Sequence, residues 1–219
     1  MLDLPPEGKW RVAIQYLGHS GFRIVSKSGT VYIDPYFSVE GGHYKRLVKP
    51  PFSVNDIKIA DLVLVTHDHF DHCDIPSIET IKKNTNAVIV GNAAVERKLH
   101  TRTTIMRPEQ VLELKGIPVR AVPADHPGET PLGYVITLNE VTIYHAGDTD
   151  SVPEKLKCDI ALLPAGGTFT MDPKQAEEAA KKLGAKLFIP MHYNTFEPII
   201  VQGGLPGHVM KVGEWVTYG

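Results

Sequence analysis

The sequence is poor in cysteine, has no long apolar run and carries little excess charge of either sign. Only two cysteines occur, Cys73 and Cys158, and they lie far apart, so neither a disulfide framework nor a cysteine-based zinc site is expected. The formal net charge of -2 argues against a broad nucleic-acid-binding face. No apolar run is long enough for a membrane span, and the first residues lack the pattern of a secretory signal. We therefore expect a cytoplasmic protein without nucleic-acid partners.

Short apolar runs of the β type recur along the chain. They lie at 12–16, 22–25, 31–33, 62–65, 87–90, 119–122, 134–138, 141–144, 160–163 and 187–189. A Ser-Lys-Ser-Gly turn joins the second and third runs, and Asn139-Glu140 joins the runs at 134–138 and 141–144, so both pairs predict hairpins. The sequence therefore mixes hairpins with strand–helix units and does not show a simple alternating βαβ order.

Three segments predict helices. One covers 76–83, and Asn92 can cap a second helix that runs to Leu99. The strongest signal begins at Asp172, which is followed by proline at the first helical position and glutamine at the third. This helix should end at Gly184, because glycine readily adopts the left-handed conformation that closes a helix.

Strands outnumber helices, and no linker rich in proline, glycine or serine divides the chain. We therefore expect one α+β domain over 1–219. The least patterned segment, 38–56, predicts a long loop that carries His43, Lys45 and Arg46. These side chains could attract a phosphate or carboxylate, although solvated charges are the more common explanation.

The most informative pattern is a histidine cluster directly after the run at 62–65. Three histidines and two aspartates stand within six residues, in the order His67, Asp68, His69, Asp71 and His72. Because His67 and His69 are two residues apart, their side chains point the same way in an extended segment. Imidazole and carboxylate groups suit zinc, manganese or iron. The number and spacing of these residues favour a metal site over a polar loop of solvated histidines.

Further motifs follow later predicted strands in a fixed order. They are Ala-Asp-His-Pro-Gly at 124–128 with His126, His-Ala-Gly-Asp-Thr at 145–149 with Asp148, and Pro-Met-His-Tyr at 190–193 with His192. Together with the cluster, this series resembles the metallo-β-lactamase superfamily of metal-dependent hydrolases. The resemblance implies an αββα sandwich of two mixed β-sheets flanked by helices. It also implies two metal ions, the first bound by His67, His69 and His126. The second would be bound by Asp71, His72 and His192, and Asp148 would bridge both.

A closer resemblance connects the chain to the small ascorbate-6-phosphate lactonase-like branch of that superfamily. It rests on the motifs at 16–22, 33–35, 164–171 and 191–194. Redox di-iron relatives carry glutamate where this chain has His69, so oxygen or nitric oxide reduction is disfavoured. The branch implies an ester or lactone substrate and zinc foremost, with manganese as the other candidate.

Several residues are predicted around the metals. His19 follows a strand and a glycine, and either a substrate contact or a structural role fits it equally. Asp34 is expected to orient a metal-binding histidine, and His145 to give structural support. Tyr193 and Asn194 are expected to line the substrate pocket.

These expectations combine into a binuclear hydrolase of a small-molecule ester or lactone. A hydroxide shared by the two metals would attack the substrate. The leaving group would be protonated by a metal-bound water, by Asp71 or by His19. Two alternatives stay open, a phosphodiesterase or phospholipase D-type hydrolase at the same site and a non-catalytic metal-binding module.

Overall fold

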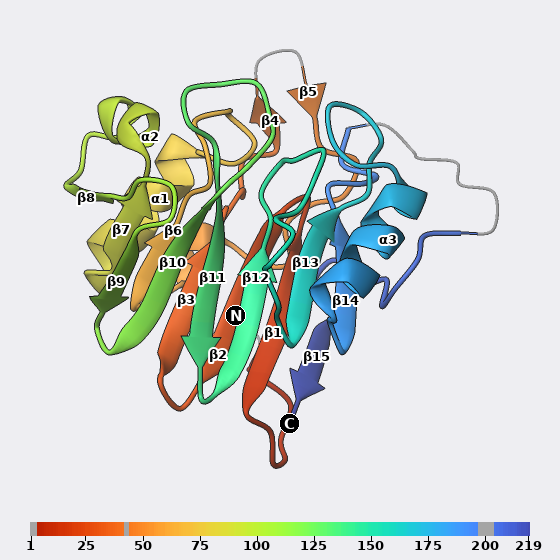
Figure 1. Cartoon of the computed structure of the whole chain (residues 1–219). Helices are drawn as coiled ribbons and strands as arrows, with labels where there is room; N and C mark the ends of the chain where they lie inside the picture. Colours follow the sequence, from red (N-terminus) through yellow and green to blue (C-terminus); the bar gives the residue numbers. More distant parts are fainter. Residues whose placement is uncertain (1–3, 42–43, 197–203) are drawn as a thin grey trace.

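The strands form two large sheets and one small hairpin in the computed structural model, which describes residues 4–41, 44–196 and 204–219 (Figure 1). The first sheet has the order β15 (Trp215–Tyr218), β1 (Val12–Gly18), β2 (Gly21–Ser26), β3 (Gly29–Ile33), β6 (Leu62–Leu64), β7 (Val88–Gly91) and β8 (Thr103–Ile105). The second has the order β14 (Leu187–Met191), β13 (Ile160–Pro164), β12 (Val141–His145), β11 (Leu132–Leu138), β10 (Ile117–Pro123) and β9 (Val111–Leu114).

Both sheets are mixed. In the first, β15, β1, β2 and β3 are antiparallel, and β3, β6, β7 and β8 are parallel. In the second, β9 to β12 are antiparallel, and β12, β13 and β14 are parallel. The hairpin turn between β11 and β12 is confirmed. Both Asn139 and Glu140 have positive φ, 48° and 62°, as a tight two-residue hairpin turn requires.

The helices cover the outer faces of the sandwich. The central core joins the inner faces of the two sheets, with Ile14, Ile24 and Leu64 on one side and Val119 and Ile136 on the other. Helices α1 (Ile75–Thr85) and α2 (Ala93–Lys98) pack on the first sheet, and α3 (Pro173–Leu183) packs on the second (Figure 1). The predicted αββα sandwich is therefore confirmed.

Helix α3 has the ends that the sequence predicts. The Asp172 side chain accepts from the backbone N–H of Gln175, and the Gln175 side chain accepts from the backbone N–H of Asp172. The helix ends at Gly184, which has φ +67°. The buried residues of α3 are Ala176, Ala179, Ala180 and Leu183. Because they recur at helical spacing, they lie on one side of the helix, and this side packs against β13 and β14.

Five strands of the described residues were not predicted. Three are β8, β9 and β15, and the other two, β4 (Glu40–Gly41) and β5 (Tyr44–Lys45), form a short hairpin inside the segment expected to be a loop. The same segment ends in a 3₁₀ turn at Val54–Asp56. No helix in the described ranges has both the length and the apolar character that a membrane span requires.

Candidate metal centre

The predicted ligands follow the ends of strands from both sheets and meet at one edge of the sandwich. His67 to His72 follow β6, His126 follows β10, Asp148 follows β12 and His192 follows β14. His19 follows β1 and joins them. Because each residue stands where a rigid strand ends, the backbone fixes the direction from which each side chain enters the site.

The first group comprises His67, His69 and His126, the residues expected to bind one metal. The Nε2 atom of His67 lies 3.0 Å from Nδ1 of His69, and that Nδ1 lies 3.3 Å from Nε2 of His126. Burial holds the pKa of His67 well below its usual value, so this ring is neutral at physiological pH. Neutral imidazole is the form that binds a metal ion.

The second group contains Asp71, His72 and His192, together with His19. Asp148 reaches both groups. Its Oδ1 lies 3.3 Å from Nε2 of His72, and its Oδ2 lies 3.1 Å from Nε2 of His192 and 3.6 Å from Nε2 of His126. Burial alone would raise the pKa of Asp148, but His192 and His72 hold it well below the usual value. The carboxylate is therefore ionised between the two groups.

His19 is held inside the second group by two hydrogen bonds. Its Nε2 lies 2.9 Å from Oδ2 of Asp71, and its Nδ1 lies 2.7 Å from Oγ1 of Thr195. Burial, with a contribution from His192, lowers the pKa of His19 to about 4. Since a carboxylate only accepts, Nε2 of the neutral ring donates to Asp71, and Nδ1 accepts from the Thr195 hydroxyl.

Asp34 lies behind the cluster and orients one of its histidines. Its Oδ2 accepts from Nδ1 of His72 and from the hydroxyl of Thr66, both at 2.7 Å, and its Oδ1 accepts from the Thr66 backbone at 2.8 Å. Burial alone would lower the pKa of His72, but the carboxylates of Asp148 and Asp34 raise it well above the usual value. In the same way, His126 uses Nδ1 to donate to the carbonyl of Phe169 at 3.1 Å, which leaves Nε2 facing the cluster.

His145 lies outside the cluster and is completely buried. Its Nε2 donates to the carbonyl of Ser20 at 2.8 Å, and its Nδ1 accepts from the backbone N–H of Gly147 at 3.2 Å. Both ring nitrogens are therefore engaged. The ring connects the segment after His19 to the segment before Asp148.

Comparison with known proteins identifies the family. The model of the beta-lactamase superfamily domain matches residues 30–193. A UPF0173 metal-dependent hydrolase of Methanopyrus kandleri is 36% identical over 207 residues, which cover 85% of this chain and 86% of that protein. The chain belongs to the metallo-β-lactamase superfamily of metal-dependent hydrolases.

Further relatives agree with this membership. A UPF0173 metal-dependent hydrolase of Thermoplasma acidophilum is 37% identical over 198 residues, covering 83% of each chain. The structure of Igni18, a metallo hydrolase of Ignicoccus hospitalis, matches with a TM-score of 0.79 and 29% identity over 95% of this chain and 98% of that one. The chain is thus a metal-dependent hydrolase, as the motif series predicts.

The residues present fit the metal that the superfamily implies. Within the described part of the chain, Nε2 of His72 and Oδ1 of Asp148 are buried and have no hydrogen-bond partner. Such orphaned buried atoms are costly unless something binds them. The two atoms face each other inside a cluster of nitrogen and oxygen donors of the kind that zinc and manganese take. This metallo-β-lactamase site can therefore bind metal.

The remaining predicted residues lie beside the cluster. Tyr193 is buried, its hydroxyl donates to the carbonyl of Met210 at 3.0 Å, and its ring stacks on Tyr16. Asn194 is exposed and lines the same cavity as Tyr193. Cys73 is a buried free thiol.

The expectation for the charged loop was partly wrong. Lys45 is exposed and forms a long ion pair with Glu40, as a solvated charge would. Arg46, in contrast, is only 5% exposed, because its guanidinium bonds backbone carbonyls in the interior. His43 lies outside the described residues.

Sequence reasoning missed residues that contact the cluster from outside it. Thr195 stands three positions after His192, and this short separation was the sequence signal that could have placed it near the site. An aromatic group beside His19 had no signal, because Tyr44, Phe70 and Phe196 are separated in sequence. Their ring centroids lie 5.2–5.9 Å apart, and Phe196 lies 5.5 Å from His19.

Proposed function

We propose that this superfamily member hydrolyses an ester or lactone bond of a small molecule and uses two divalent metal ions. One observation supports the proposal above the others: the Asp148 carboxylate lies between two groups of ligands and approaches both. Two metal ions held side by side lower the pKa of a shared water and polarise the bond to be broken.

Two metal ions would divide these residues between them. His67, His69 and His126 would hold the first ion, and the second would be held by Asp71, His72 and His192. Asp148 would bridge them. The imidazole-rich set favours zinc, and manganese is the second candidate.

Two side chains of the second group, Asp71 and His19, have defined protonation states. Burial alone would raise the pKa of Asp71, but the hydrogen bond from His19 and the nearby His72 lower it well below the usual value. Asp71 is therefore an ionised carboxylate at neutral pH. It accepts the hydrogen bond from His19 and would bind a metal ion, and it is not a proton donor. His19 keeps its proton on Nε2 against Asp71, which positions that carboxylate.

The proposed function also includes the domain organisation, the location in the cell and the partners of the enzyme. Both sheets contribute to one central core, which supports a single hydrolase domain over 1–219. We expect a cytoplasmic enzyme with a small-molecule substrate and without a nucleic-acid partner. The formal net charge of -2 supports the last point.

The test reconstitutes the protein separately with zinc and with manganese and measures bound metal by mass spectrometry. Each form is then assayed on lactones, p-nitrophenyl esters and bis(p-nitrophenyl) phosphate. We expect two metal equivalents and higher kcat/KM on esters or lactones. Asp148→Ala and His69→Ala should lose metal and lower kcat/KM by about a hundredfold or more.

The control is His100→Ala, which removes an exposed histidine outside the site. Higher activity on the phosphodiester would replace the ester proposal with a phosphodiesterase. Inactivity on every substrate with both metals bound would indicate a non-catalytic module. Full metal and activity in Asp148→Ala would refute the two-metal site itself.

A further inference from the structure

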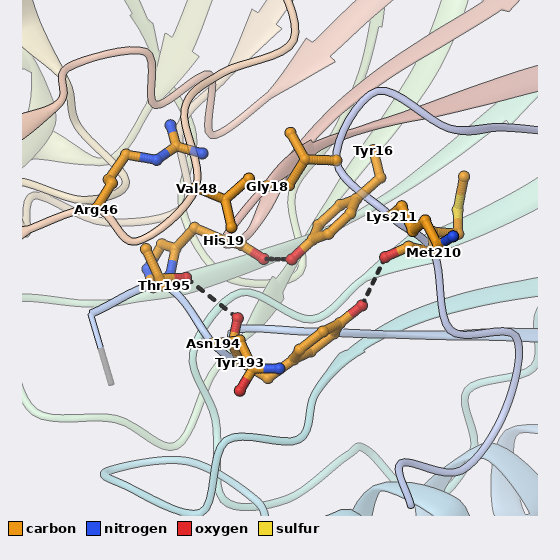
Figure 2. A pocket seen from close by; sticks show the side chains of 11 residues that line it. Tyr16, Gly18, His19, Arg46, Val48, Tyr193, Asn194, Thr195, Met210 and Lys211 are labelled. Carbon is orange, nitrogen blue, oxygen red and sulfur yellow. Dashed lines mark hydrogen bonds between the residues drawn. The ribbon is translucent and has the colours of Figure 1, made fainter. Parts of the chain in front are cut away.

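A cavity lies against His19, one of the clustered residues, and Figure 2 shows the side chains that line it. Its volume is about 320 Å³, enough for a small organic molecule. The end of β1, the segment 193–195 after β14 and the segment 210–212 before β15 form its walls, together with Arg46 and Val48. Among the described residues, His19 is the member of the metal cluster that lines this cavity.

Arg46 is a buried cation in the wall of this cavity. Its Nη1 donates to the carbonyl of Tyr36, and its Nη2 donates to the carbonyl of Leu17 at 3.1 Å. Its Nε is buried and has no hydrogen-bond partner among the described residues. The guanidinium also lies 4.9 Å from the centroid of the Tyr36 ring.

Among the described residues, Arg46 has no carboxylate within ion-pair distance, and Asp74 acts on its charge only from farther away. A buried charge is costly unless it is paired. Two neutral carbonyls satisfy part of its donor set but cancel none of its charge. The second charged side chain that lines the cavity, Lys211, is also a cation, and the described residues of the lining include no aspartate or glutamate.

The backbone is arranged to bring the guanidinium to this wall. Gly18 has φ +93°, and a Cβ atom there would overlap Nη2 of Arg46, so glycine provides the space. The backbone N–H of Leu47 donates to the carbonyl of Thr195 at 2.7 Å, and the Thr195 hydroxyl contacts His19. Arg46 is therefore placed by the same segment that supports the metal site.

We propose that this cavity is an anion subsite, in which Arg46 binds the carboxylate or phosphate group of a small molecule. Guanidinium groups recognise these anions through charge-assisted hydrogen bonds. The anionic group would occupy the cavity beside His19, and the rest of the molecule would extend to the metal cluster. This substrate assignment rests on the proposed hydrolase, whereas binding of the anion does not.

The first experiment measures binding without turnover. Inorganic phosphate is titrated into the metal-loaded protein at low salt by calorimetry. Val48 lines the cavity and is 50% exposed, so Val48→Glu places a competing carboxylate at its mouth, and Val48→Gln is the uncharged match. We expect Val48→Glu and Arg46→Lys to weaken binding by about tenfold or more, and Val48→Gln to change it by less than about threefold.

Controls separate this result from trivial causes. Val39→Glu adds the same charge to an exposed position of the same segment that does not line the cavity, and it should bind phosphate as the wild type does. Val48→Glu keeps Arg46 and its two carbonyl bonds, so it remains informative if Arg46→Lys does not fold. The proposal is overturned if the wild type does not bind phosphate, or if Val48→Glu binds as tightly as Val48→Gln.

The second experiment asks where the anion comes from. p-Nitrophenyl acetate and the p-nitrophenyl monoester of glutarate share a leaving group, but only the second carries a free carboxylate. If the substrate supplies the anion, Val48→Glu should raise KM for the glutarate ester by about tenfold and leave the acetate ester within about twofold. If a separate anion occupies the cavity, both esters respond alike, and phosphate alters the turnover of the acetate ester in the wild type only. Hydrolysis of neither ester would count against the proposed function, and the phosphate titration would still decide the anion subsite.

Discussion

The carboxylate of Asp34 accepts a 2.7 Å hydrogen bond from Nδ1 of His72, and this bond determines which nitrogen of His72 faces Asp148. With its single proton on Nδ1, a metal-binding His72 would present the lone pair of Nε2 to the metal, on the side where Oδ1 of Asp148 lies 3.3 Å away. Asp34 also accepts from the backbone and the hydroxyl of Thr66, the residue before His67. One buried carboxylate thus orients the beginning and the end of the histidine cluster.

We predict that Asp34→Ala weakens metal binding by about 10- to 100-fold, because His72 loses the bond that fixes its orientation. Competition with a chromophoric chelator measures the affinity. Asp159→Asn, a substitution outside the site, should leave the affinity unchanged. Circular dichroism shows whether Asp34→Ala keeps the fold, and unchanged metal affinity in a folded Asp34→Ala protein would contradict the positioning role.

Gly166 should be intolerant of a side chain because the backbone of His192 lies against it. A Cβ atom at Gly166 would overlap the carbonyl oxygen of His192 and would lie 3.3 Å from Nδ1 of that ring. We expect Gly166→Ala to displace His192 and to reduce kcat/KM by about tenfold or more.

The matched control for Gly166→Ala is Gly116→Ala in the turn between β9 and β10. Gly116 has φ +76° and open space around it, so alanine there strains the backbone away from the site. Thermal denaturation of both variants separates the two effects. If the Gly116→Ala variant loses as much kcat/KM as Gly166→Ala, general destabilisation explains the loss and displacement of His192 does not.

Asp159 should make stability depend on pH. Its carboxylate accepts from Nζ of Lys186 at 2.8 Å and from the backbone N–H of Thr142 at 3.0 Å, and these bonds lower its pKa. A lowered pKa stabilises the fold above the unfolded value of about 3.9, and this stabilisation is lost as pH falls through the folded value. Urea unfolding should show wild type more stable than Asp159→Asn by about 1 kcal/mol at pH 7.

The difference between wild type and Asp159→Asn should shrink as the pH falls below about 4, since the protonated carboxyl resembles the amide. Comparing the two proteins at each pH removes the contribution of other groups. A difference that stays constant from pH 7 to pH 3 would show that the charge of Asp159 does not contribute.

Both cysteines should be unreactive in the folded enzyme. Burial raises the pKa of Cys73 and of Cys158 to about 12, so almost no thiolate is present at pH 8. A chromogenic disulfide reagent should therefore react with neither thiol until urea is added, and then with both. Rapid reaction of one thiol in the native protein would show that it is accessible, and single serine variants would identify it.

The sequence predicted features whose signals are local. Helix α3 could be placed to the residue because its cap, proline and terminal glycine are close together in the chain. The histidine cluster was recognisable for the same reason, since its members lie within six residues. Motif order then brought in Asp148 and His192, which local spacing alone would not have connected to the cluster.

Features that depend on long-range contacts were not predictable. Strand β15 was missed because its four residues become a strand by pairing with β1 at the other end of the chain. The buried state of Arg46 depends on the carbonyls of Leu17 and Tyr36, and the role of Thr195 depends on a histidine far from it in sequence. A pattern in one segment contains no information on such partners.

The backbone N–H of His192 donates to the carbonyl of His19 at 2.8 Å, although most of the chain separates these residues. Contacts of such large sequence separation form late and slowly during folding, because the entropy of closing the intervening chain is lost before the contact stabilises anything. The ligand cluster should therefore be absent from partly folded states and appear together with the last native contacts. Metal uptake by refolding protein would then report the final step of folding, and excess metal present from the start would not accelerate the earlier ones.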